Sequence, residues 1–190
     1  FHYTYKHLKF LKILKIEYFT ISLLGLIGTM IMISANSLLM LYLGIELLSL
    51  SLYALIGFNK KSSLSSEAAI KYYVLGAMSS GILLFGISLI YGFTGSIAYD
   101  DIASQLINID MDSVDYIAII FGIIFITASL CFKFGAAPFH MWVPDIYQGS
   151  LISTTILLST LPKIAVFIVF LKLYFIPFIL LREVWSDILI

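Results

Sequence analysis

The chain has one cysteine, Cys131, and one arginine, Arg182, among its 190 residues. A single cysteine excludes an intrachain disulfide, a CxxC redox pair and a four-cysteine iron–sulfur site. No strand followed by GxGxxG and no Walker sequence occurs, so no nucleotide site is predicted. Charged residues make up 12% and the formal net charge is zero, which gives no indication of nucleic-acid binding. We therefore expect no cofactor or metal in this chain.

What the chain has instead is apolar side chains. Its composition is 61% hydrophobic and its mean hydropathy is +1.06, whereas soluble domains are about 45–50% apolar and about 25% charged. This composition predicts an all-α polytopic membrane protein. The bias toward Ile, Leu, Phe, Tyr and Lys also fits AT-rich coding, as in many organelle genomes.

Five membrane spans are predicted from the apolar runs, because one crossing needs about 20 apolar residues. They cover 18–33, 38–58, 66–93, 115–134 with a half-helix at 139–148, and 150–174. The stretch 115–148 is too long for one plain crossing and too short for two with a loop, so one interrupted crossing is expected. The predicted organisation is a basic amphipathic flank at 1–16, a five-helix bundle at 17–174 with a broken helix near 135–138, and a segment at 175–190. That last segment reads either as an interfacial helix or as the start of a further span.

The lysines predict the orientation. Lys6, Lys9, Lys12 and Lys15 lie in the flank, and Lys60-Lys61 lie two crossings later, hence on the same side. The stretch 94–115 carries five aspartates and no lysine or arginine, and it falls on the opposite side. Positively charged loops stay inside, so the lysines are expected in the cytoplasm or the mitochondrial matrix.

The stretch CFKFGAAPFHMWVPDIYQG, 131–149, places helix-breaking residues inside an apolar segment. Gly135 and Pro138 are predicted to break the fourth crossing, and Pro162 is predicted to interrupt the fifth. Irregular backbone in a bilayer is tolerated only where protein buries it or where it lines a wet cavity.

Three ionisable residues, Glu46, Lys133 and Lys163, lie deep inside predicted spans. Each costs about 2.5–3.5 kcal/mol on insertion scales unless a partner or water is present. Two lysines beside helix interruptions, together with a glutamate, favour a proton path; a purely structural Glu46–Lys133 pair is the alternative. His140 is either a proton shuttle or a packed residue, and Lys71 is placed where it could reach the membrane surface by snorkelling.

Four motifs resemble one known family. They are SANSLLMLYLGIELLSLSLYAL, EAAIKYYVLGAMSSGILLFGISLIYGFTGS, KFGAAPFHMWVPDIYQGS and LPKIAVF. Together they resemble the antiporter-like membrane subunits of respiratory complex I, and the VPDIYQGS ending is similar to the subunit 2 branch. The resemblance implies proton-path roles for Glu46, Lys133 and Lys163, and connecting roles for Lys71 and His140.

The same resemblance implies a subunit of the proton-translocating NADH:ubiquinone reductase in the mitochondrial inner membrane. NADH, FMN, iron–sulfur clusters and ubiquinone are then expected in other subunits, and the partners are other complex I membrane subunits and lipids. The family fold is an inverted repeat, of which this sequence holds the first half. We therefore expect either a fragment or a shortened or split subunit that another chain completes. The alternatives are a subunit of a cation/proton antiporter or membrane hydrogenase, and a structural half-repeat that does not conduct.

Overall fold

The computed structural model describes residues 2–11, 13, 15–107, 109, 113–182 and 185–186, and over these residues the regular elements are all helices. They are α1 (His2–Phe10), α2 (Ile16–Ser34), α3 (Leu38–Ile56), α4 (Ser63–Thr94), α5 (Tyr99–Leu106), α6 (Val114–Phe134), α7 (Trp142–Gly149), α8 (Ile152–Phe175) and the short 3₁₀ helix η1 (Ile179–Leu181). Five of them, α2, α3, α4, α6 and α8, are long and apolar enough to cross a membrane. The predicted all-α polytopic fold is confirmed.

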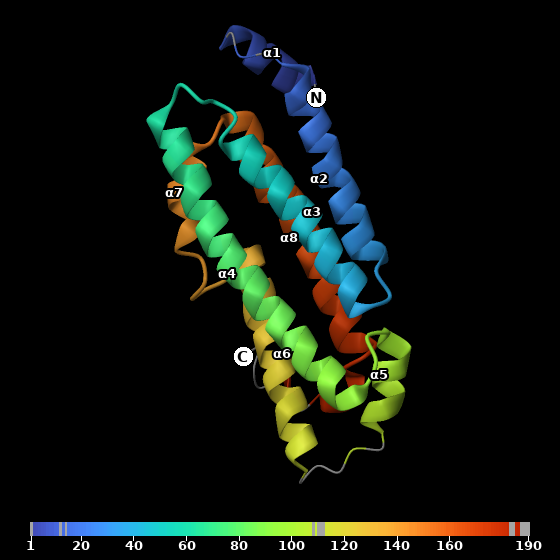
Figure 1. Ribbon diagram of the computed structural model, residues 1–190. Coiled ribbons are helices and arrows are strands. Elements are labelled where there is room, and N and C mark those ends of the chain that lie inside the picture. Colours follow the sequence, from blue (N-terminus) through green and yellow to red (C-terminus); the bar gives the residue numbers. More distant parts are fainter. Residues whose placement is uncertain are drawn as a thin grey trace.

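Successive long helices run antiparallel, so α2, α4 and α8 point one way and α3 and α6 the other (Figure 1). Figure 1 shows α1, α7 and the α3–α4 connection at one end of the bundle, and α5 with the α2–α3 turn at the other. The lysine-bearing flank and the Lys60-Lys61 connection therefore share one end, and Asp100 and Asp101 of α5 lie at the opposite end, while Asp110 and Asp112 lie outside the described residues. Lys6, Lys9 and Lys15 are exposed, while Lys12 lies outside the described residues.

Glycines set the closest helix contacts. A Cβ on Gly28 of α2 would lie 2.7 Å from the backbone nitrogen of Leu48 in α3. A Cβ on Gly44 of α3 would lie 2.7 Å from the nitrogen of Met32 in α2. Small residues at such positions let helices approach in lipid, where packing rather than the hydrophobic effect drives association. The α2–α3 pair is therefore held at a backbone-to-backbone distance that alanine would not permit.

Helices α6 and α7 pack in succession along α4, which runs antiparallel to them. Gly122 faces Gly86, where an added Cβ would lie 2.8 Å from the Gly122 oxygen. Further along, the Ser79 and Ser129 hydroxyls contact each other at 3.0 Å. Where α7 ends, a Cβ on Gly149 would lie 2.7 Å from the carbonyl oxygen of Leu64. Because these contacts progress along the whole of α4, α6 and α7 together make one interrupted crossing.

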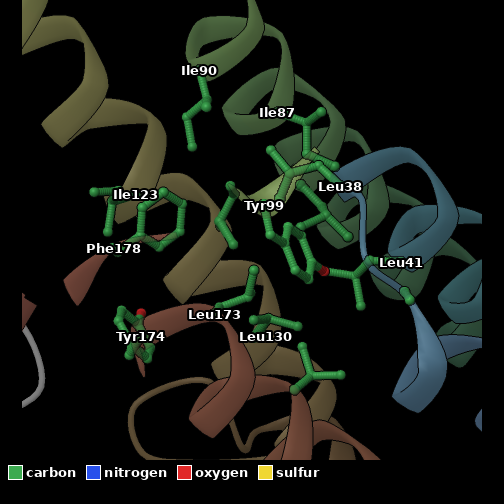
Figure 2. Packing of buried hydrophobic residues seen from close by; sticks show 14 of the residues in the cluster. Leu38, Leu41, Ile87, Ile90, Tyr99, Ile123, Leu130, Leu173, Tyr174 and Phe178 are labelled. Atoms are coloured by element: carbon green, nitrogen blue, oxygen red, sulfur yellow. The ribbon is translucent and has the colours of Figure 1, made fainter. Parts of the chain in front are cut away.

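The main apolar core lies toward the α5 end of the bundle. Figure 2 shows Tyr99 of α5 close to Leu38 and Leu41 of α3, with Ile123 of α6 beside Phe178. The α2–α3 turn also pairs with the segment before α5, because the Tyr99 nitrogen donates to the Asn36 carbonyl at 3.1 Å. This end of the bundle is thus closed by packing and by backbone hydrogen bonds.

Four sequence expectations differ from the structure. The stretch 94–115 was expected as a polar connection but contains α5, because Tyr99, Ile102 and Leu106 recur at helical spacing and are buried. Helix α4 begins at Ser63 rather than at 66, because the Ser62 side chain accepts from the Ser65 nitrogen at 3.3 Å. The half-helix expected from 139 begins at Trp142.

The fourth difference concerns Pro162, which was expected to interrupt the fifth crossing. Helix α8 continues through this residue, so Pro162 does not break it. In lipid no water is available to bond freed backbone groups, so retaining the remaining helical bonds is favoured. The hydroxyls of Ser159 and Thr160 donate to the Ile156 carbonyl, not to the Leu158 carbonyl that the proline leaves free.

Candidate functional site

A buried lysine marks the candidate site. Lys133 lies in the last turn of α6, just before the helix ends at Gly135, whose positive φ of 75° suits glycine. Its side chain is 6% exposed. The ammonium donates to the Ser49 hydroxyl of α3 at 2.9 Å and to the Ser80 hydroxyl of α4 at 3.3 Å. Two neutral hydroxyls therefore hold this cation inside the bundle.

The site lies at mid-depth of the bundle. Ser49 and Ser80 each sit near the middle of a membrane-spanning helix, as does Pro162 of α8. Residues of α2, α3, α4 and α8 enclose a cavity of about 10 Å³ together with Lys133; its lining is Met32, Ile45, Leu48, Ser49, Leu52, Tyr72, Lys133, Pro162 and Val166. A cavity needs about 10–15 Å³ to hold one water. The ammonium therefore adjoins a space the size of a single water molecule.

Glu46 lies on the same face of α3 as Ser49, three residues earlier. One of its carboxylate oxygens, Oε1, is buried and makes no hydrogen bond to the described residues. Glu46 and Lys133 form no ion pair within 4.0 Å in the described part of the chain. A buried oxygen without a hydrogen-bond partner is costly, and a water molecule can supply the missing bond. The predicted structural pairing of Glu46 with Lys133 is therefore not formed as a closed salt bridge.

The break after Lys133 is anchored by an indole. The Trp142 Nε1 donates to the Phe132 carbonyl at 3.0 Å, and the Trp142 ring stacks on Tyr72 of α4 at 5.0 Å between centroids. The Gly135 nitrogen donates to the Cys131 carbonyl at 2.9 Å, which closes the end of α6. Protein groups thus satisfy the backbone where the helix stops, directly beside Lys133.

The other predicted residues do not join this cluster. Lys71 bonds Glu67 at 2.8 Å and Asp145 of α7 at 3.0 Å, and these side chains are about half exposed. His140 is exposed in the segment between α6 and α7. Lys163 is half-buried on α8 and makes no hydrogen bond or ion pair within the part of the chain that the structure describes. The structure therefore places Glu46 one helical turn from the serine that holds Lys133, and it shows no bond from Lys71, His140 or Lys163 to either group within the described residues.

Sequence reasoning missed the partners of Lys133. Ser49 stands three residues after Glu46, and that spacing could have identified it; Ser80 carries no comparable signal in the sequence. Lys172, at the end of α8, was also missed: its ammonium donates to the Asn36 side chain at 2.9 Å and to the Ile33 carbonyl at 3.3 Å. This lysine lies at the carboxyl end of α2, where a cation is favoured by the helix dipole.

These features define a polytopic helical membrane protein with a buried amine at mid-depth beside a broken helix, and a half-buried carboxylate one helical turn from the serine that holds it. The family profile described as "NADH:quinone oxidoreductase/Mrp antiporter, TM" matches residues 35–190. The chain belongs to this family.

Curated relatives include subunit N of the bacterial NADH-quinone oxidoreductase. The protein from Ruthia magnifica is 49% identical over 171 residues, which cover 90% of this chain and 35% of the relative. That from Pelagibacter ubique is 44% identical over 185 residues, which cover 97% of this chain and 38% of the relative. The chain thus spans about a third of the length of the curated relatives it matches.

Solved structures of similar fold include a chain of respiratory complex I from Thermus thermophilus, with a TM-score of 0.71 and 32% identity over 83% of this chain and 34% of that one. A chain of an archaeal membrane-bound sulfane sulfur reductase has a TM-score of 0.68 and 30% identity, covering 76% of this chain and 28% of its own length. A chain of the Mrp complex from Dietzia, at 22% identity and a TM-score of 0.72, shares the fold.

Proposed function

We propose that this chain forms part of a membrane-arm subunit of a proton-translocating NADH:quinone oxidoreductase, and that Lys133 carries the transferred proton. The observation that supports this most strongly is the Lys133 ammonium itself, which is nearly fully buried at mid-depth and whose hydrogen bonds within the described residues go to Ser49 and Ser80. An ion retained there at an energetic cost, without a closed salt bridge, is free to exchange its proton when its surroundings change.

Each neighbour of Lys133 has a role in this proposal. The hydroxyls of Ser49 and Ser80 can accept from an ammonium or donate to a neutral amine, so both protonation states of Lys133 find a partner. Glu46 stands three residues before Ser49 on the same face of α3, and its buried Oε1 has no hydrogen-bond partner among the described residues, so it is proposed as a further group of the proton path. The water-sized cavity supplies the space through which a proton reaches the amine.

The redox chemistry lies outside this chain in the proposal. NADH oxidation and quinone reduction, with FMN and iron–sulfur clusters, belong to other subunits of the complex, so this chain contributes proton transfer and no redox centre. Its partners are neighbouring membrane subunits and lipid. Since the chain spans about a third of its relatives, we propose that further helices, in the same or another polypeptide, complete the path.

We place the α1 and Lys60-Lys61 end on the side from which protons are taken up. The positive-inside bias supports this orientation, and the AT-rich residue usage supports the mitochondrial inner membrane, with that end in the matrix. Lys71, bonded to Asp145 near this end, and His140, exposed beside α7, are proposed as connections toward the matrix. Lys163 of α8 is proposed to pass the proton on to the further helices that complete the path.

The proposal is tested by measuring the number of protons translocated per electron in membrane vesicles that carry the assembled complex. Lys133→Ala and Glu46→Ala should lower this ratio while the complex stays assembled and continues to reduce quinone. Lys60→Ala, in the α3–α4 connection, is the matched control and should keep the wild-type ratio. An unchanged ratio in Lys133→Ala would refute the role of Lys133, and copurification without any redox subunit would favour an antiporter.

A further inference from the structure

We propose that Tyr53 is a positioning residue for Lys133: its hydroxyl, seated in a notch left by Gly76, orients the Ser49 hydroxyl that holds the Lys133 ammonium. This inference rests on the proposed proton-transfer role of Lys133 and extends it outward by one residue. Two observations support it: the spacing of the polar residues on α3, and the fit of the Tyr53 side chain against Gly76.

Three polar residues of α3 lie along one stripe. Glu46, Ser49 and Tyr53 follow at intervals of three and four residues, so they lie on one face of the helix. Ser49 accepts from the Lys133 ammonium at 2.9 Å. Tyr53 stands one helical turn after Ser49 on this face of α3. Tyr53 is thus a neighbour of the serine that holds Lys133.

Gly76 provides the seat for the Tyr53 hydroxyl. A Cβ built on Gly76 would overlap the Tyr53 oxygen and would lie 2.9 Å from the ring carbon Cζ. The space that any other residue would fill at position 76 is therefore occupied by the phenol. The ring is held from two further sides by edge-to-face contacts with Tyr72 at 4.9 Å and with Tyr73 at 5.6 Å between centroids.

The chemistry explains why a phenol suits this position. While Lys133 is charged, its ammonium occupies a lone pair of Ser49, and the Ser49 proton must be donated elsewhere. While Lys133 is neutral, its amine accepts, so Ser49 must turn and donate to it. Tyrosine can either accept from Ser49 or donate to it, so it can follow both arrangements. Phenylalanine fills the same notch but can do neither.

The test uses the assembled complex in vesicles, with Tyr53→Phe and Gly76→Ala compared with wild type. Tyr53→Phe removes the hydroxyl and keeps the ring, and Gly76→Ala keeps the hydroxyl but displaces it. Each should slow proton translocation about 2- to 10-fold, the effect of one hydrogen bond, with quinone reduction and assembly retained. Matched controls are Tyr73→Phe, half exposed beside the same ring, and Gly81→Ala, which has open space around it; both should stay at the wild-type rate.

Two further readouts separate positioning from simple packing. Both changes disturb the same contact between the Tyr53 hydroxyl and Ser49, so the combined loss in the double variant should be smaller than the product of the two single losses. The pH at which translocation is half-maximal should move in Tyr53→Phe and stay fixed in Tyr73→Phe. The titratable groups facing the Tyr53 phenol are Glu46 of α3, Tyr72 and Tyr73 of α4, and, through Ser49, Lys133 of α6.

Lys133→Ala, measured in parallel, distinguishes the two levels of the argument. If it lowers translocation while Tyr53→Phe and Gly76→Ala match wild type, the role of Tyr53 is refuted and the proposed function stands. If the losses in translocation rate caused by Tyr53→Phe and Gly76→Ala multiply in the double variant, the positioning role is also refuted. If Lys133→Ala leaves translocation unchanged, both proposals fail together.

Discussion

Replacing Gly86 by alanine should push α4 away from α6 and lower the free energy of unfolding. The new Cβ would lie 2.8 Å from the Gly122 carbonyl oxygen and 3.1 Å from the Ile126 nitrogen. Both are backbone atoms, so no side chain can turn aside and the helices themselves must move. Overpacking of this kind costs about 1–3 kcal/mol. Since Ser80 and Lys133 join the same two helices, the shift should also lengthen that contact.

The matched control is Gly81→Ala on the same helix, where a Cβ meets no atom within 4 Å. Alanine favours helix over glycine by about 0.8–1.0 kcal/mol, so this variant should be as stable as wild type or more so. Thermal unfolding in detergent, followed by circular dichroism, measures both variants, with about 2–4 °C expected per kcal/mol for a chain of this size. The reasoning fails if Gly86→Ala unfolds at the same temperature as Gly81→Ala.

Three further substitutions can be ranked with the same unfolding assay. Ser49→Ala leaves the buried Lys133 ammonium one acceptor short and should cost about 1.5–3 kcal/mol; a cost near zero would show that the hydroxyl does not hold the cation. Trp142→Phe keeps an aromatic ring but removes the bond to the Phe132 carbonyl, so a loss of about 0.5–1.5 kcal/mol is expected, and an unchanged midpoint would mean that the break is held by stacking alone. Lys172→Met should cost about 0.3–1 kcal/mol through the lost cation at the end of α2, a loss that ought to shrink as salt is added.

Hydropathy alone was enough to predict the five crossings. Lipid admits few backbone arrangements, so apolar runs of sufficient length must be helices. The interruption after Lys133 was also predictable, because Gly135 and Pro138 leave no continuous helix across that stretch. What hydropathy could not indicate was α5, a short helix outside the candidate spans that is detectable only through the spacing of Tyr99 and Ile102.

The site was only partly predictable. Glu46 and Lys133 stand out as charges in apolar surroundings, but the partners of Lys133 lie 84 and 53 residues away along the chain. Which faces of α3 and α4 meet α6 depends on how the helices rotate against one another. That rotation is set by the steric fit of small residues such as Gly86 and Gly122, which a single sequence does not order into pairs.

Pro162 shows that a proline within an apolar run is not sufficient to predict a break in the helix. Proline removes one donor, but the consequence depends on what surrounds the helix. Here the proline ring lines the cavity beside Lys133 and the helix continues past it. The residue thus helps to shape the site without breaking α8, a role that the sequence pattern did not distinguish from interruption.

The most direct test of the account is a density map of the assembled complex that resolves ordered water around Lys133. The account predicts the Lys133 amine between Ser49 and Ser80 at the middle of the bilayer, with a water in the adjoining cavity on the way to Glu46. A lysine side chain turned toward bulk solvent, or a cavity that is dry and sealed from Glu46, would contradict it.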